Sequence, residues 1–599
     1  MSTTPGESGG GEKADPTAGR AGGAEGDTDE LGRALTFLDT NFERETVVRG
    51  GYAVGIGVAT LAGSLTSVLT SPSAGLLGSL LAFLAVTHLS HQFPIWLADV
   101  RRTRALGTAP DLLGRAVLRM RIEPSPERAV RFAARTGSNP LAESLQKHVR
   151  RSAGDPGPGL RPFVAEWREW FPAVERAATR LRSAAAAPPE RRDRALDRAL
   201  TTVVDAATDR MGAFVGDVRG PVSAIYAFGV LLPLALVALL PAARAAGAPI
   251  GAGVMTLIYV VLLPFGLLAA SAWLLQRRPV AFPPPRIDGS HPDVPNRRTE
   301  ATLAGLVTAG ILWLLARHLV VPWAAPLAAA GGGTGVALLV VTRPRRRVLH
   351  RIRAVESGLS DALTIVGGEV AEGVAVEQAV ARAGEAVSGP TGELFRAAAR
   401  RSQLLRVGVG DAFRGEAGPT TSTSSPRIRG AVELLAVAGR EGEPAGDVIV
   451  ELADQLDRLT ALDREATRQL ATVTSTLANT ATVFGPLVGG ATVALAAGMD
   501  PGTGSAGLGA AANAASSTAT TSADPTGLPA TTGAAPIPVA TIGRIVGVYV
   551  LLLAAILVAL STTLERGFDR TLVGYRVGLA LPTATATYLV AFVAASHLL

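Results

Sequence analysis

The stretch IVGVYVLLLAAILVALST, residues Ile545–Thr562, contains no charged residue and consists mainly of Val, Leu, Ile and Ala. A helix of about 20 apolar residues crosses the hydrocarbon core of a bilayer. Similar blocks recur on both sides of this stretch, and nine such blocks predict membrane spans rather than buried soluble helices. The other eight blocks are Tyr52–Thr70, Gly75–Ile95, Val222–Leu240, Ile250–Leu275, Ala301–Ala316, Val320–Thr342, Leu477–Ala497 and Val577–Leu598. We therefore expect an all-α, polytopic membrane protein.

The composition agrees with this fold class. Of the 599 residues, 48% are hydrophobic and 18% are charged, whereas an average soluble protein has roughly 25% charged residues. The chain has no cysteine, which excludes disulfides, thiolate metal sites and cysteine nucleophiles. The net charge of +7 comes from arginines that flank the apolar blocks, so it requires no nucleic acid as a partner.

The arginines also predict the orientation of the chain, because Lys and Arg near span ends stay in the cytoplasm. One set of loops is rich in arginine: Arg101, Arg102, Arg104, Arg277, Arg278, Arg297, Arg298, Arg343, Arg345, Arg346, Arg347, Arg566, Arg570 and Arg576. The opposite set carries only Arg244, Arg317 and Arg544. We expect a plasma-membrane protein with its N-terminus in the cytoplasm and its C-terminus outside.

Composition shifts divide the chain into alternating membrane and hydrophilic segments, and residues 1–30 have the acidic, polar composition of a disordered tail. The predicted segments are the tail with an amphipathic lead-in (1–48), spans one and two (49–98), a cytoplasmic helical domain (99–219), spans three and four (220–276), a Pro/Arg-rich cytoplasmic linker (277–299), spans five and six (300–342), a second cytoplasmic helical domain (343–475), span seven (476–498), an extracellular Ala/Gly/Ser/Thr-rich loop (499–541), span eight (542–564), a cytoplasmic loop (565–576) and span nine (577–599).

The two cytoplasmic domains are related to each other. At a constant offset of 250 residues, 11 of the 41 positions in 111–151 are identical to their counterparts, without a gap. The identical pairs include Asp111 with Asp361, Glu127 with Glu377, and Arg150-Arg151 with Arg400-Arg401. Both domains are rich in Ala, Leu, Arg and Glu, which favours helical bundles. We expect a parallel internal repeat of two spans, one helical domain and two spans, followed by a ninth span.

The predicted helix starts and ends are clearest in the second domain. Gly373 ends one predicted helix and Val376–Ala386 forms the next, while Ile428–Ala438 is a further helix. The last helix of the domain, from Val448, carries apolar residues on one face and runs on into the span at Leu477.

Two short elements of the second domain resemble a known family. The stretch Glu372–Val380 (EGVAVEQAV) and the stretch Gly442–Val448 (GEPAGDV) are similar to elements of the type II secretion system F family, which includes the platform proteins of type IV pilus and archaellum machines. The first domain has Glu123-Pro-Ser-Pro126 at the first of these positions and lacks the second element. The number of spans resembles that of the multi-span archaeal members.

The resemblance implies an assembly platform that is not an enzyme and needs no cofactor. It implies a cytoplasmic secretion ATPase and pilin-like subunits as partners, with membrane lipids around the spans, and a homodimer. The candidate ATPase contacts are the duplicated arginines and the residues of the two matching elements: Arg150, Arg151, Glu377, Arg400, Arg401, Glu443 and Gly446.

The residues themselves favour no catalytic chemistry. The carboxylates of the repeat lie one to a helix among other charges, so a structural or interface role is the more probable interpretation. Gly331–Gly335 lies inside a predicted span and lacks the lysine of a phosphate-binding loop, which favours close helix packing. His88 and His91 share a helix face but have no third metal ligand nearby.

Two other functional classes stay open. The spans have no charged residue in their central turns, which argues against an ion-coupled transporter but allows a permease for an uncharged or lipid-like substrate. A membrane-anchored scaffold is the third hypothesis, although no kinase, cyclase or receiver motif occurs in the sequence.

Overall fold

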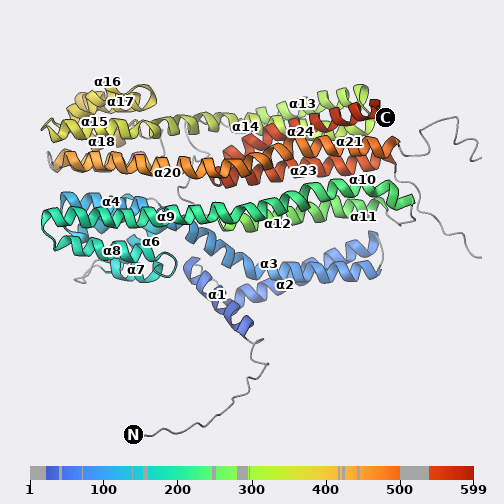
Figure 1. Cartoon of the computed structure of the whole chain (residues 1–599), viewed down its shortest axis with the longest axis horizontal. Coiled ribbons are helices and arrows are strands. Elements are labelled where there is room, and N and C mark those ends of the chain that lie inside the picture. Colours follow the sequence, from blue (N-terminus) through green and yellow to red (C-terminus); the bar gives the residue numbers. More distant parts are fainter. Residues whose placement is uncertain are drawn as a thin grey trace, which may run out of the picture. The chain divides into compact units, whose positions relative to one another are not determined.

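The computed structural model describes residues 22–38, 44–69, 72–137, 139–152, 159–245, 251–278, 294–295, 297–415, 418–420, 425–441, 445–498 and 538–598. Every regular element in these ranges is a helix (Figure 1), as the sequence predicts. The chain divides into two compact units, Met1–Thr103 and Arg104–Leu599, and each is described by itself.

The first unit contains α1 (Gly22–Leu38), α2 (Arg44–Leu69) and most of α3 (Pro72–Leu106). Tyr52 of α2 stacks on Phe83 of α3, with 6.4 Å between ring centroids, so α2 and α3 pack along each other. Helix α1 begins inside the stretch 1–30 that we predicted to be a disordered tail, where alanine and glutamate favour a helix.

Seven helices among the described residues are long and apolar enough to cross a membrane. They are Pro189–Leu239, Ala252–Gln276, Arg298–Leu319, Pro322–Ala371, Gly446–Gly498, Val539–Arg566 and Arg570–Leu598. They cover the last seven predicted spans to within two residues at each end, including the shortest one at Ala301–Ala316. The first two predicted spans lie in α2 and α3, which are not among the seven, so the total of nine stays a prediction.

Three of these helices, Pro189–Leu239, Pro322–Ala371 and Gly446–Gly498, are 50 residues or longer and extend far beyond a bilayer's thickness. Two of the three have a lobe at their N-terminal end, and we call them the first and second long helix. The first long helix consists of α9 (Pro189–Tyr226), the π-helical turn η1 (Ala227–Leu231) and α10 (Leu232–Ala245). The second long helix consists of α20 (Gly446–Asn479), the π-helical turn η5 (Thr480–Phe484) and α21 (Gly485–Gly498). The second is 53 residues long, or about 80 Å at 1.5 Å per residue. The sequence prediction that this helix runs on into the span is confirmed.

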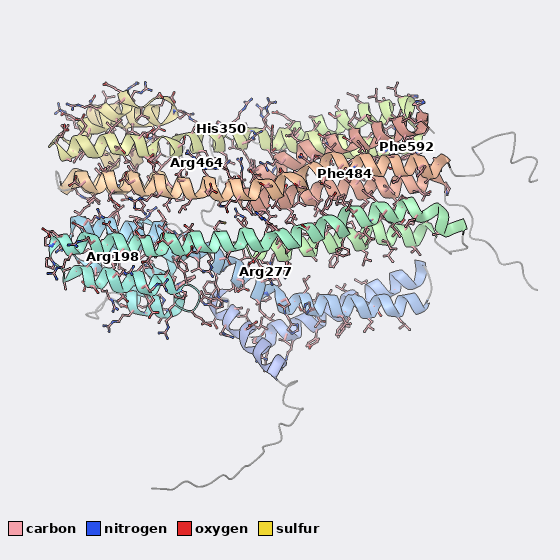
Figure 2. The ribbon with its side chains drawn as sticks, in the orientation of Figure 1. Arg198, Arg277, His350, Arg464, Phe484 and Phe592 are labelled. Carbon is pink, nitrogen blue, oxygen red and sulfur yellow. The ribbon has the colours of Figure 1, made fainter. Side chains whose placement is uncertain are left out.

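Each long helix carries a lobe of shorter helices at its N-terminal end (Figure 1). The first lobe consists of α4 (Ala109–Ile122), α5 (Pro126–Thr136), α6 (Pro140–Arg151), α7 (Leu160–Trp167) and α8 (Pro172–Ala185) with the start of α9. The second lobe consists of α15 (Leu359–Ala371), α16 (Val376–Ala386), α17 (Gly389–Leu405), α18 (Val409–Arg414) and α19 (Pro426–Glu441) with the start of α20. Figure 2 shows Arg198 and Arg464 on the lobe parts of the long helices, and Phe484 in the span part.

Helix bounds in the two lobes correspond at the offset of 250 residues. Helix α5 spans 126–136 and α16 spans 376–386, and α4 and α15 begin at 109 and 359. Buried positions correspond as well, for example Val130 with Val380. The sequence prediction for Val376–Ala386 is confirmed, and Gly373, with a φ of +85°, lies in the turn before it.

The remaining spans pack as a bundle around α23 (Val539–Arg566). They are α11 (Ala252–Thr256) with the π-helical turn η2 (Leu257–Leu262) and α12 (Leu263–Gln276), then α13 (Arg298–Leu319), α14 (Ala325–Ser357) and α24 (Arg570–Leu598). A Cβ atom on Gly333 would lie 2.7 Å from the Cβ of Ala309 on α13, and one on Gly335 would lie 2.4 Å from Pro582 on α24. The interpretation of Gly331–Gly335 as a close-packing stretch is therefore confirmed.

Candidate functional site: the lobes and the long helices

The duplicated arginines lie near the C-terminal ends of equivalent helices in different lobes. Arg150 and Arg151 are exposed at the end of α6, and Arg400 is exposed near the end of α17. Arg401 differs, because it is half-buried and its Nε has no hydrogen-bond partner among the described residues. Arg401 lies close to Gly415, where a Cβ atom would meet its Nη2 at 2.3 Å. Three of the four arginines are therefore accessible to a partner, and the fourth packs within its own lobe.

The other predicted contacts do not gather into one patch with these arginines. Glu377 is half-buried in the first turn of α16. Gly446 is buried at the start of α20, where a Cβ atom would lie 2.5 Å from the backbone nitrogen of Ala371. Its role is thus to let α20 approach the end of α15. Glu443 lies outside the described residues.

A seam between the two lobes was not predicted, and Arg115 lies at its centre. The Arg115 side chain is 7% exposed and forms an ion pair with Asp111 at 3.1 Å. Its Nη1 donates to the Thr136 carbonyl at 2.8 Å, and its Nη2 donates to the Pro426 carbonyl of the second lobe at 3.2 Å. One guanidinium thus joins α4, α5 and α19, and its fixed fork of donors suits this task.

Small residues bring the helices together along the same seam. A Cβ atom on Gly114 would lie 1.8 Å from Nε2 of Gln455 on α20, and that amide donates to the Pro110 carbonyl at 3.4 Å. Leu118 and Phe132 of the first lobe belong to the hydrophobic core of the second lobe. The lobes therefore share apolar core as well as hydrogen bonds. A glycine inside a helix costs about 1 kcal/mol relative to alanine, and at Gly114 the absence of a side chain leaves room for Gln455.

An ion-pair network links the two long helices beside the seam. Arg121 of α4 forms an ion pair with Asp197 of α9 and a second one with Glu451 of α20, the latter at 3.6 Å. The Arg121 side chain is only 17% exposed, so water screens these charges less than at an open surface. Arg121 thereby connects α9 and α20 through α4.

In the described part of the span bundle, each π-helical turn has a proline two residues after its end. These prolines are Pro233 after η1, Pro264 after η2 and Pro486 after η5. Proline has no N–H to donate, which leaves a carbonyl one turn earlier without its helical partner. The Tyr549 hydroxyl donates to one such carbonyl, that of Gly229. The Tyr259 hydroxyl donates to the Pro233 carbonyl at 2.7 Å. Buried hydroxyls thus join the first long helix to α23 and to the helix containing η2.

Arginine also fixes the end of the span bundle that is nearer the lobes. Arg278, just after α12, donates to the carbonyl oxygens of Leu564 at 2.7 Å and Glu565 at 3.4 Å. These carbonyls lie at the C-terminus of α23, where a cation is favourable. Burial lowers the pKa of Arg278 to about 10, and the charge of Asp463 partly offsets this shift, so the guanidinium stays protonated at neutral pH. Figure 2 shows the neighbouring Arg277 at this junction.

The carboxylates and histidines singled out in the sequence do not converge. Asp111 is paired with Arg115, whereas Asp361 and Glu127 are exposed on their helices. Within the described ranges no three His, Asp or Glu side chains lie close enough together to hold a metal ion. Comparison with known proteins adds no assignment, since the chain matches no protein-family model, no curated protein and no solved structure.

Proposed function

We propose that the protein is an integral-membrane assembly platform of a type IV pilus-like, archaellum-like or type II secretion-like machine. In this proposal a secretion ATPase binds the two lobes from the cytoplasm, and pilin-like subunits are inserted at the spans. The observation that carries the proposal is the continuity of each long helix from a lobe into a span. A continuous helix can pass a displacement of its lobe directly into the membrane.

Three further features support this proposal. The helix bounds of α4 and α5 agree with those of α15 and α16 at the offset of 250 residues, which favours a duplicated domain. The seam at Arg115 and the network at Arg121 tie the lobes together, so that they would move as one body. The π-helical turns η1 and η5 lie where the long helices enter the apolar part, and such turns are places where helices adjust.

The roles of the predicted contacts follow from their exposure. Arg150, Arg151 and Arg400 would meet acidic groups of the ATPase, while Arg401 and Gly446 would hold the second lobe in shape. Apolar side chains that point away from the bundle, such as Leu306 and Phe265, would face membrane lipids. A homodimer would place four lobes before a ring-shaped ATPase.

Two experiments test the proposal. The chain has no cysteine, so a single introduced cysteine reports its own position. An impermeant maleimide should label S596C on intact cells, and should label S183C in the first lobe and S388C in the second only after the cells are opened. Labelling of either lobe on intact cells would refute a cytoplasmic platform.

The second experiment asks whether the lobes bind an ATPase. Charge reversal of Arg150, Arg151 and Arg400 together should abolish co-purification of the secretion ATPase and filament assembly. R440E changes an exposed arginine at the end of α19 and is the matched control. Normal ATPase binding by the triple variant, or substrate uptake by the purified protein in liposomes without any ATPase, would contradict the proposal.

A further inference from the structure

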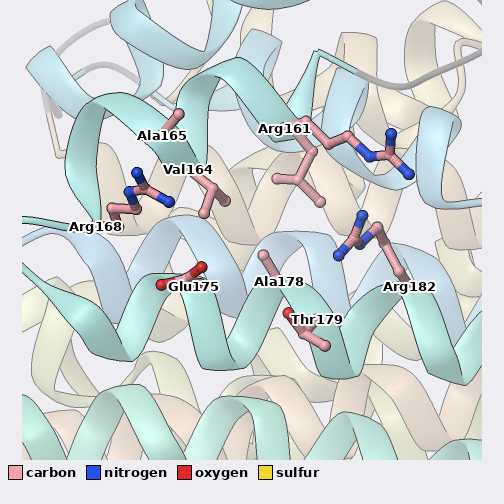
Figure 3. A pocket seen from close by; sticks show the side chains of 9 residues that line it. Arg161, Val164, Ala165, Arg168, Glu175, Ala178, Thr179 and Arg182 are labelled. Carbon is pink, nitrogen blue, oxygen red and sulfur yellow. The ribbon is translucent and has the colours of Figure 1, made fainter.

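The first lobe has an open groove between α7 and α8, shown in Figure 3. Its cavity volume is about 360 Å³. The apolar side chains of Leu160, Val164 and Ala178 line it, and three arginines stand around them: Arg161 from α7, Arg168 just after α7, and Arg182 from α8. The groove therefore combines an apolar floor with a strongly basic rim.

The side chains of the rim arginines are not tied to other groups. Among the residues that the structure describes, the guanidinium groups of Arg161, Arg168 and Arg182 form no hydrogen bond or ion pair, and Glu175 is the one acidic residue in the lining. By contrast, Arg180, which is also in α8 but does not line the groove, donates to the Arg198 carbonyl of α9 at 2.7 Å. In Figure 3, Arg161 and Arg182 lie next to each other at one end of the groove, while Arg168 lies at the other end beside Glu175. Two neighbouring guanidinium groups repel each other, and an anion between them would remove that repulsion.

We propose that this groove binds an acidic segment of a partner protein, with carboxylates between Arg161 and Arg182 and an apolar side chain on the floor. Three arginines against one glutamate give the groove the charge that complements such a segment. The arginines stand at opposite ends of an elongated floor, whereas a phosphate-binding pocket would direct them to one point. A peptide with spaced carboxylates fits this arrangement better than a single phosphate group.

In the second lobe, Arg414 of α18 forms an ion pair with Glu433 of α19, so this arginine has its own counter-charge. We therefore place the acidic segment at the first lobe. This inference rests on the proposed function for the identity of the partner, which would be the secretion ATPase, and it adds a second contact surface to the one at Arg150, Arg151 and Arg400.

Binding to the groove is tested on the full chain in lipid nanodiscs. The probe is a fluorescein-labelled peptide of 12 residues with alternating glutamate and leucine, and its control replaces glutamate by lysine. The acidic peptide should bind saturably and more weakly at high salt, and R161E/R182E should weaken binding about tenfold. R176E changes an exposed arginine on the same helix that does not line the groove, and it should bind as the unchanged protein does.

Equal affinity of R161E/R182E and R176E for the acidic peptide would overturn the groove assignment. The milder R161Q/R182Q, with a melting temperature checked against the unchanged protein, gives the same answer if the charge reversal fails to fold. The partner is tested separately by co-purification. If the ATPase co-purifies with R176E but not with R161E/R182E, the ATPase is supported as the occupant of the groove. If the two variants recover the same amount of ATPase, this assignment of the occupant is overturned. If the peptide binds but no ATPase is recovered even with the unchanged chain, the platform function fails while the groove stands.

Discussion

The first and second lobes begin alike and end differently. Over α4–α6 and α15–α17 the helix starts agree to within one residue at the offset of 250, and many buried positions correspond. Beyond that point the first lobe has α7 and α8 with an open basic groove, while the second has the short α18 tied to α19 by Arg414 and Glu433. Helices α4–α6 and α15–α17 thus form similar scaffolds. The helices that follow differ, and in our proposal this difference decides which lobe has arginines available to bind a partner.

A second difference lies in how each lobe meets its long helix. In the second lobe Gly367 of α15 faces α20 so closely that a Cβ atom would lie 2.8 Å from the backbone nitrogen of Val450. The first lobe carries the buried Val117 at the corresponding position of α4. The second lobe thus has a close backbone approach between α15 and α20 at a position where the first lobe has a valine side chain. We expect the second long helix to be the more rigidly attached of the two.

The largest effect is expected from giving the second lobe the first lobe's residue. Gly367→Val places three carbon atoms against the backbone of α20, which has no room to move without shifting the helix. Overpacking of this kind costs about 3 kcal/mol, so the thermal unfolding temperature should fall and amide exchange in α15 and α20 should rise. Gly368→Val is the matched control, because a Cβ atom there has nothing within 4 Å. Similar stability of the two variants would show that the two lobes meet their long helices in the same way.

Separating the lobes should have the next largest effect. Arg115→Met keeps the length of the side chain but removes the donors to the Thr136 and Pro426 carbonyls and leaves Asp111 unpaired. Loss of such buried, charge-assisted hydrogen bonds costs about 2 kcal/mol. Amide exchange should therefore rise at the start of α19 as well as in α4. Arg131→Ala removes an exposed arginine of α5 and should leave amide exchange unchanged both in α4 and at the start of α19. Exchange that rises in α4 alone would mean that the seam does not couple the lobes.

Local patterns predicted the fold well where neighbours in sequence decide it. Uncharged blocks marked the spans, Gly373 marked a helix end, and Gly331–Gly335 marked a close helix contact. The seam could not be found in this way. Arg115 and Pro426 are separated by 311 positions, and an arginine four residues after an aspartate resembles an ordinary solvated helix pair.

The candidate site was predicted only in part for the same reason. The arginine pairs found at the offset of 250 lie in α6 and α17, but the packing around them differs, and it buries part of Arg401. The groove arginines lie in α7, just after it and in α8, outside the 41 matched positions, so no comparison between copies pointed to them.

The smallest effect is expected at the turn between the first two helices of each lobe. In the second lobe Gly373 has a φ of +85°, a conformation that costs an alanine about 1 kcal/mol. The corresponding residue of the first lobe, Glu123, is extended with a φ of −136° and needs no such freedom. Gly373→Ala should therefore lower the stability of the second lobe by about 1 kcal/mol, measured by amide exchange in α15 and α16.

Space around Gly373 is not the reason for this cost, because a Cβ atom there would meet nothing within 4 Å. Gly368→Ala, in the helix just before the turn, has equally free surroundings and should raise stability slightly, since alanine favours helices over glycine. If Gly373→Ala lowers stability and Gly368→Ala raises it, the cost at Gly373 comes from its backbone conformation. If both substitutions change stability in the same direction, the turns at Glu123 and Gly373 do not differ in this way, and the glycine of the second lobe is not needed to connect α15 to α16.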